Sequence, residues 1–390
     1  MSYRSLFGVR EFRYLYASLT LSYIGDQLSA VAVSVLVFDR TGSALLTALA
    51  YASAWLPGIV GGPLLGPLAD RLPRRDVLVV CDMARALLVS VLAIPGISVS
   101  VAIALLYITH AFKSPFTAAR SALLPEVLSG QTYITGNGLN NITHQVANVV
   151  GFGLGGIVVT LLRPNGTLLL DAATFAVSAV LVRIGVRQRP AAVTSAGRYH
   201  LLRESVEGLR YVFGDRWLRG CLLLVWFGLA LPFGPEAVAY PYAQELNGGA
   251  RAAGVMLAAP GLGYIVGAVL LTRVLTPRMR NRLLVPFATM SSAALVPALL
   301  SPPLPVVVLL LLIVGIGSAF SAPLNAIFAQ LIAPEYRGRA MAVAISGILA
   351  MQGLAFLLTG ALVDAGLPLA TVVGLLGILG LLAVAASTLT

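Results

Sequence analysis

Long apolar stretches separated by short polar segments dominate the chain. Twelve of these stretches are long enough to cross a membrane, since a helix of about 20 residues spans roughly 30 Å of hydrocarbon. They cover residues 12–38, 45–68, 77–95, 99–123, 133–162, 168–186, 218–242, 252–275, 283–300, 306–332, 340–363 and 369–389. Because the runs are continuous rather than alternating, and because backbone polar groups must be satisfied inside the bilayer, we predict helices. The expected fold is an all-α membrane protein of twelve transmembrane helices.

Composition and charge support this interpretation. Of the 390 residues, 58% are hydrophobic and 11% charged, too few charges for the surface of a soluble protein of this size. The net charge is +11, and the arginines are distributed unevenly between the two sides of the twelve-span arrangement. On one side fall 22 arginines, Arg85 among them, and on the other only Arg40, Arg163 and Arg251. The positive-inside rule places both termini in the cytoplasm. This distribution gives no reason to expect a nucleic-acid partner.

One connection, residues 187–216, differs from the others. A small-residue stretch is followed by Leu202, Val206, Leu209 and Phe213 at helical spacing, which predicts an amphipathic helix at the inner membrane surface. The flanking parts repeat weakly at an offset of about 204 residues, as Phe116-Thr117-Ala118 and Phe320-Ser321-Ala322 show. We therefore predict two pseudo-symmetric six-helix bundles, residues 1–186 and 217–390, joined by a cytoplasmic linker at 187–216.

Charged side chains within a span are costly, so each is a functional candidate. Asp26 lies mid-span, and two stripes accompany it: Ser18, Ser22 and Ser29 on its own helix, and His110, Lys113, Thr117 and Arg120 on the fourth. At about 1.5 Å per residue, Asp26 and His110 lie at similar depth. We hypothesise that Asp26 takes up and releases a proton and that His110 or Lys113 tunes it. The alternative is a static ion pair that orients the helices.

Other polar groups are weaker candidates. Asp82 and Arg85 lie on one helix face, and we expect a scaffold role in which they pair with each other or with the Arg74/Arg75 loop. Glu236 is surrounded by Pro232, Pro235 and Pro241, so its helix is expected to be interrupted. Glu236 could be a second proton or substrate site, or a residue in a water-exposed vestibule.

The tenth span offers polar groups that could line a cavity or serve ordinary packing: Ser318, Ser321 and Asn325. Gly151, Gly153 and Gly156 formally match a dinucleotide fingerprint, but no strand-to-helix turn surrounds them, so close helix approach is the better interpretation. No nucleotide loop, metal cluster or hydrolase motif is found. We therefore expect no cofactor, no metal and no enzymatic activity.

The charged island at residues 66–76, with the spacing Gly-x-x-x-Asp-Arg-x-x-Arg-Arg, resembles the loop between the second and third helices of the major facilitator superfamily. Stretches at 21–27, 37–43, 81–86, 122–126, 214–218 and 333–339 resemble its macrolide-efflux and enterobactin-exporter-like branch. The resemblance implies that the first and fourth helices line a central cavity, with Ser22, Ser29, Thr117, Ser321 and Asn325 as candidate contacts. It also implies a cytoplasmic gate in which Asp70 faces the start of the eleventh helix. The gate residues would be Gly66, Asp70, Arg71, Arg74, Arg75, Arg337 and Arg339.

The expected function is export of amphipathic small molecules, such as antibiotics or natural products, by a proton-coupled antiporter with alternating access. The partners would be the substrate, protons and the lipid bilayer of a bacterial inner membrane, and the protein is expected to be a monomer. A lysophospholipid or siderophore carrier on the same fold is one alternative. A non-transporting membrane sensor or scaffold is another, since fold does not fix function.

Overall fold

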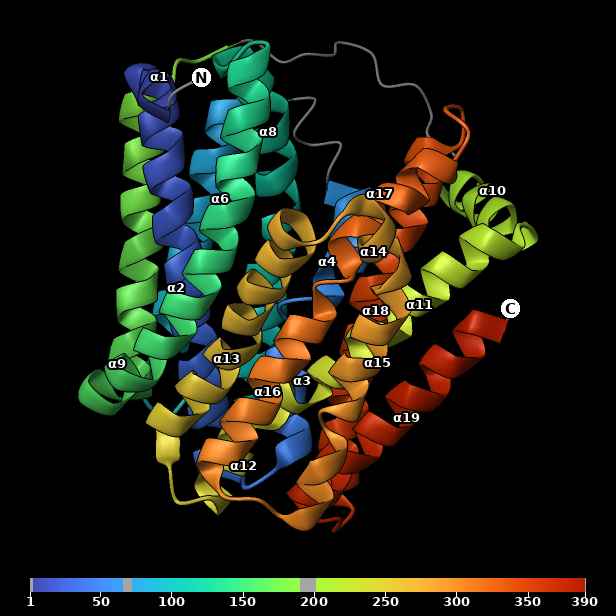
Figure 1. Ribbon diagram of the computed structural model, residues 1–390. Helices are drawn as coiled ribbons and strands as arrows, with labels where there is room; N and C mark the ends of the chain where they lie inside the picture. Colours follow the sequence, from blue (N-terminus) through green and yellow to red (C-terminus); the bar gives the residue numbers. More distant parts are fainter. Residues whose placement is uncertain (1–2, 66–71, 190–200, 390) are drawn as a thin grey trace. The chain divides into compact units, whose positions relative to one another are not determined.

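The computed structural model describes residues 3–65, 72–189 and 201–389, and every regular element in these ranges is a helix (Figure 1). The prediction of an all-α protein is therefore confirmed. The chain divides into two compact units, the first made of residues 1–36 and 56–198 and the second of residues 37–55 and 199–390. The predicted domain boundaries at 186 and 217 remain predictions.

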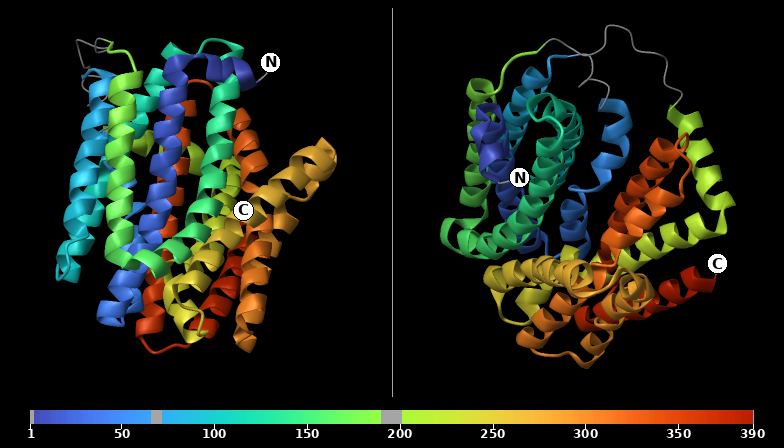
Figure 2. Two further views of the ribbon diagram at one scale, coloured as in Figure 1. Left: turned by 90° about the vertical axis from the view of Figure 1, so that its left-hand side faces the viewer. Right: turned by 45° about the horizontal axis from the view of Figure 1, so that its top comes forward.

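The first unit is built mainly from long helices. Its elements are α1 (Tyr3–Gly8), most of α2 (Arg10–Thr41), α4 (Leu56–Leu65), α6 (Arg74–Leu92), α7 (Val99–Ala111), α8 (Lys113–Val127) and α9 (Gln131–Gly185). A buried apolar cluster, which includes Leu15, Leu78 and Phe116, joins α2, α6, α8 and the end of α9. The two limbs of α9 lie on either side of α2 (Figure 2).

The second unit begins with the end of α2 and α3 (Ala44–Ala52) and continues after the linker. Its remaining elements are α10 (Leu201–Gly214), α11 (Arg216–Phe233), η1 (Gly234–Val238), α12 (Ala239–Glu245), α13 (Gly249–Val269), η2 (Leu270–Val274), α14 (Pro277–Arg282), α15 (Leu284–Ala293), η3 (Val296–Leu300), α16 (Leu304–Ser318), α17 (Ser321–Leu331), α18 (Arg337–Asp364) and α19 (Leu369–Leu389). The linker contains the expected helix, α10, whose Val206 and Leu209 are exposed. Its place at the inner membrane surface stays a prediction.

Eight helical stretches in the described part of the chain are long and apolar enough to span a membrane. They are Arg10–Thr41, Val99–Val127, Gln131–Gly185, Arg216–Glu245, Gly249–Val274, Leu304–Leu331, Arg337–Asp364 and Leu369–Ser387. The longest, α9, contains two predicted spans, because the backbone turns at Arg163 (φ 60°, ψ 166°) just before Pro164. Ala44–Ile59 and Leu284–Leu300 are shorter apolar segments. The count of twelve crossings stays a prediction.

The glycines of α9 allow close helix packing, as the sequence suggested. A Cβ atom at Gly151 would lie 2.7 Å from Gln27 Cβ of α2, and one at Gly155 would lie 3.0 Å from Val31. The contact is reinforced where the Gln27 side-chain amide donates a hydrogen bond of 2.8 Å to Asn148. This packing fixes α2, which carries Asp26, against the first limb of α9.

Candidate functional site

Asp26 lies in a buried ion-pair cluster inside the first unit. The Nη2 atom of Arg85 on α6 donates a hydrogen bond of 2.5 Å to Asp26 Oδ1. The Nζ atom of Lys113 lies 3.5 Å from Asp26 Oδ2. The Arg85 side chain is 2% exposed and that of Asp26 10%. Two cations therefore hold the Asp26 carboxylate in a region with little water.

Arg85 also approaches Asp82, one turn earlier on α6. Its Nη1 atom lies 3.9 Å from Asp82 Oδ1, which confirms the expected pair, but the closer partner of Arg85 is Asp26. Asp82 Oδ2 accepts a hydrogen bond of 2.5 Å from the Ser178 hydroxyl on α9. The guanidinium carbon of Arg85 lies 3.9 Å from the centre of the Phe175 ring, a cation–π contact. Arg85 thus links α2, α6 and α9.

A third acid, Asp171 on α9, completes the cluster and was not among the predicted site residues. Its side chain is 1% exposed. The Thr174 hydroxyl donates to the Asp171 backbone carbonyl at 2.8 Å and also lies 3.3 Å from Asp171 Oδ1. The Ser29 hydroxyl of α2 faces the same carboxyl group. A Cβ atom at Gly25 would collide with Asp171 Oδ1 and Thr174 Oγ1, so only glycine lets Asp171 lie directly on α2 beside Asp26.

The predicted companions of Asp26 have mixed outcomes. Lys113 forms an ion pair with Asp26, and His110 is close enough to interact electrostatically with Asp26. His110 Nδ1 lies 2.9 Å from the Leu106 carbonyl oxygen, at the end of α7. Ser22 and Ser29 are buried, whereas Thr117 is exposed. Their role in a substrate cavity stays a prediction.

Glu236 belongs to the second unit, where η1 interrupts the predicted span between α11 and α12. The expected interruption is confirmed. Glu236 Oε2 accepts a hydrogen bond of 3.1 Å from the Tyr51 hydroxyl, and Tyr51 packs beside Trp55 and Phe356. Ser321 is buried at the start of α17 and Asn325 half-buried one turn later. Whether they contact substrate is untested.

The predicted cytoplasmic gate is only partly described, because Gly66, Asp70 and Arg71 lie outside the described residues. Arg74 forms an ion pair with Glu126 and donates to the Ala122 carbonyl at 3.0 Å. The other described gate residues are placed as follows: Arg75 donates to Gln188 at 2.8 Å, Arg339 pairs with Glu207 of α10 at 2.9 Å, and Arg337 is exposed. The gate itself stays a prediction.

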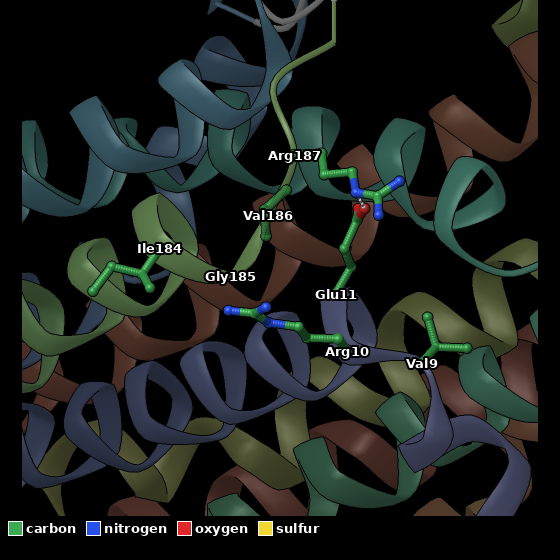
Figure 3. A pocket seen from close by; sticks show the side chains of 7 residues that line it. All are labelled: Val9, Arg10, Glu11, Ile184, Gly185, Val186 and Arg187. Carbon is green, nitrogen blue, oxygen red and sulfur yellow. Dashed lines mark ion pairs between the residues drawn. The ribbon is translucent and has the colours of Figure 1, made fainter.

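A pocket of about 380 Å³ lies away from this cluster, between the start of α2 and the end of α9 (Figure 3). It is lined by Val9, Arg10, Glu11, Ile184, Gly185, Val186 and Arg187. Glu11 forms ion pairs with Arg187 at 3.4 Å and with Arg189 at 2.9 Å. At about 1.5 Å per residue, Asp26 lies roughly 22 Å further along α2, so the pocket is not part of the cluster.

Comparisons with known proteins agree with the fold. Residues 15–237 and 233–390 match the family model described as Major Facilitator Superfamily. The chain is similar to the multidrug efflux pump Tap of Mycolicibacterium fortuitum, with 30% identity over 375 residues, 90% of this chain and 88% of that protein. The Tap pump of Mycobacterium tuberculosis (strain ATCC 25618 / H37Rv) is also 30% identical, over 378 residues, 91% of this chain and 87% of that protein.

Solved structures share the fold at low sequence identity. The nucleoside transporter NupG aligns over 96% of this chain and 98% of its own, with a TM-score of 0.71 and 15% identity. A bacterial homologue of the human lysosomal transporter Spinster, in an inward-facing and occupied conformation, aligns over 98% and 96%, with a TM-score of 0.74 and 14% identity. At these identities the likeness concerns the fold alone.

Proposed function

Because this chain belongs to the major facilitator superfamily, we propose that it exports amphipathic small molecules by alternating access, driven by proton entry. Family membership and its apolar helices make it a multi-pass membrane transporter rather than an enzyme. Similarity to the Tap multidrug efflux pumps over about nine-tenths of the chain supports drugs or similar compounds as substrates. The same similarity supports a bacterial cell membrane, with both termini cytoplasmic by the positive-inside rule.

The proposed proton coupling rests on one observation: the buried Asp26 carboxylate lies between Arg85 and Lys113. An intramembrane acid is expensive to keep charged, so its ion pairs and a bound proton are alternative ways to neutralise it. In the proposed cycle, a proton from the outer side binds an Asp26 oxygen and weakens its pairs with both cations. Release of that proton to the cytoplasm restores the pairs.

Coupling requires that binding of the proton and binding of the substrate weaken each other. If a proton on Asp26 lowers the affinity for substrate, bound substrate must lower the affinity for the proton by the same factor. Coupling free energies of about 1–3 kcal/mol, or roughly 5–150-fold in affinity, are usual for such linkage. Binding of substrate from the cytoplasm would therefore favour the deprotonated, ion-paired cluster, and protonation from outside would favour release.

The test is efflux of ethidium, a lipophilic aromatic cation, from proteoliposomes with an imposed pH gradient. Native protein should export the dye only when the gradient is present. Asp26→Asn preserves size and polarity but cannot carry a proton, so gradient-driven efflux should be lost while pH-independent dye binding remains. The matched control is Glu245→Gln, an exposed acid at the end of α12, which should behave as native. Full gradient-driven efflux by Asp26→Asn would contradict the proposal.

A drug-susceptibility panel in a pump-deficient host addresses the range of substrates. Expression of the native chain should raise the tolerated concentration of several amphipathic antibiotics, and Asp26→Asn should not. If the native chain moved no compound in either assay, a sensor or scaffold would become the better explanation.

A further inference from the structure

The buried cluster around Arg85 holds one more acid than it has cations. Three carboxyl groups come from three helices: Asp26 from α2, Asp82 from α6 and Asp171 from α9. Among the described residues, the cations that face these acids directly are Arg85 and Lys113. His110 and His144 lie near Asp26, and Arg120 on α8 faces Tyr23 and His144 rather than the three acids. With both histidines neutral and every acid ionised, the three acids and their two facing cations would carry one net negative charge inside the membrane region.

The three acids differ in how their charge is compensated. Asp26 has both cations within 3.5 Å. Asp82 has Arg85 Nη1 at 3.9 Å and the Ser178 hydroxyl at 2.5 Å, although its Oδ1 atom makes no hydrogen bond. Asp171 forms no ion pair within 4 Å with any described residue. The groups nearest its carboxyl oxygens are hydroxyls: Thr174 Oγ1 lies 3.3 Å from Oδ1, and Ser29 of α2 faces the same carboxyl group.

An ionised carboxylate that is 1% exposed and supported only by hydroxyl groups is strongly disfavoured, whereas a protonated carboxyl at the same place is neutral and can donate a hydrogen bond. One proton also cancels the excess charge of the cluster. We propose that Asp171 is a second proton-binding residue, which carries a proton while Arg85 is paired with Asp26.

The Asp171 proton can take part in the proposed transport cycle. This part of the inference rests on the function proposed above. Asp171 contacts α2 at Gly25 and Ser29, on both sides of Asp26 in the sequence. If the Asp171 O–H bond breaks and the proton passes to an Asp26 oxygen, the total charge is unchanged. Arg85 is then released from Asp26 and attracted to Asp82 and Asp171. The cluster thus has two arrangements of equal charge, which the proton gradient and the substrate can bias.

Infrared spectroscopy of the purified protein tests the resting proton without substrate or transport. A protonated carboxyl gives a C=O stretching band that shifts in deuterated water. The native-minus-variant difference spectrum at neutral pH should contain this band for Asp171→Asn and lack it for the exposed control Glu245→Gln. Asp171→Glu, which keeps the acid, should move the band rather than remove it. This second variant keeps the test decisive if Asp171→Asn does not fold.

The outcomes separate this inference from the proposed function. A native spectrum with no band assignable to position 171, in either variant, would overturn the inference even if Asp26→Asn abolished efflux. A band lost in Asp171→Asn would support it even if dye transport failed. For the transport role, Asp171→Asn should change the pH profile of ethidium efflux, and an unchanged profile would contradict that role.

Discussion

Removing the Arg85 side chain should destabilise the first unit strongly. In Arg85→Met the apolar bulk stays, but Asp26 loses its 2.5 Å partner and Asp82 its only cation within 4 Å among the described residues. Deleting one member of a buried ion pair typically costs about 3–5 kcal/mol, because the remaining charge is uncompensated. Lys113 still lies 3.5 Å from Asp26 and is 36% exposed, so we expect the lower end, about 3 kcal/mol.

The assay is a double-mutant cycle on the free energy of unfolding of the purified protein, measured by SDS titration with tryptophan fluorescence. Asp26→Asn removes the charge that Arg85→Met exposes, so the double variant should be more stable than Arg85→Met alone. The coupling energy between the two positions should reach up to about 3 kcal/mol. Arg278→Met, an exposed arginine at the start of α14, should change stability by about 0.5 kcal/mol or less.

A double variant no more stable than Arg85→Met would contradict this expectation. That result would mean that Arg85 and Asp26 do not compensate each other, whatever the distance between them. A loss in Arg278→Met as large as in Arg85→Met would indicate a general effect of removing arginines rather than the buried pair.

Three further predictions concern packing, helix capping and the gate. Gly151→Ala should lower the free energy of unfolding by about 1–3 kcal/mol, because the new methyl group overpacks the contact with α2. Gly138→Ala on the same helix, with nothing within 4 Å of the new methyl group, should raise it by up to about 1 kcal/mol. The thermal unfolding midpoints of the two variants measure the difference. Asp364→Asn should cost about 1 kcal/mol in the same assay, because the Asp364 carboxylate accepts bonds from the Ser43 hydroxyl at 2.5 Å and from backbone N–H groups at the start of α3. Asp70→Asn should impair transport in vesicles and leave folding intact, and an unaltered transport rate would argue against the gate.

The sequence predicted Asp26 because a lone acid in a long apolar run needs no structural information to be noticed. It missed the main partner, Arg85, for a physical reason. Arg85 was grouped with the cytoplasmic arginines, since loop charges and buried charges look alike near the end of a span. Only the packing of α6 against α2 shows that its side chain is buried and faces Asp26. Asp171 gave a usable signal, an acid within the span 168–186, but its neighbours Gly25 and Thr174 could not be known without the fold.

The positions at which helices break also show what the hydrophobic pattern of the sequence could not predict. The interruption at Glu236 was predictable from three nearby prolines. The breaks at Phe112 and Phe320 were not predicted, although each lies three residues before a proline, Pro115 and Pro323. A proline has no N–H and its ring crowds the carbonyl four residues earlier, so the helix restarts just before it. The hydrophobic run continues across both breaks, and periodicity alone therefore joins two helices into one.

All the described charged groups around Arg85 belong to the first unit. The partners of Asp26 (Arg85, Lys113 and His110) and those of Asp171 (Ser29 and Thr174) all lie within residues 1–36 and 56–198. In the proposed cycle, a proton bound here would first change the packing of α2, α6 and α9 within the first unit. Under this proposal, substrate would be coupled to the proton through contacts that respond to that packing. We therefore expect variants on α2 beside Asp26 to change the pH dependence of efflux more than variants of equal burial in the second unit.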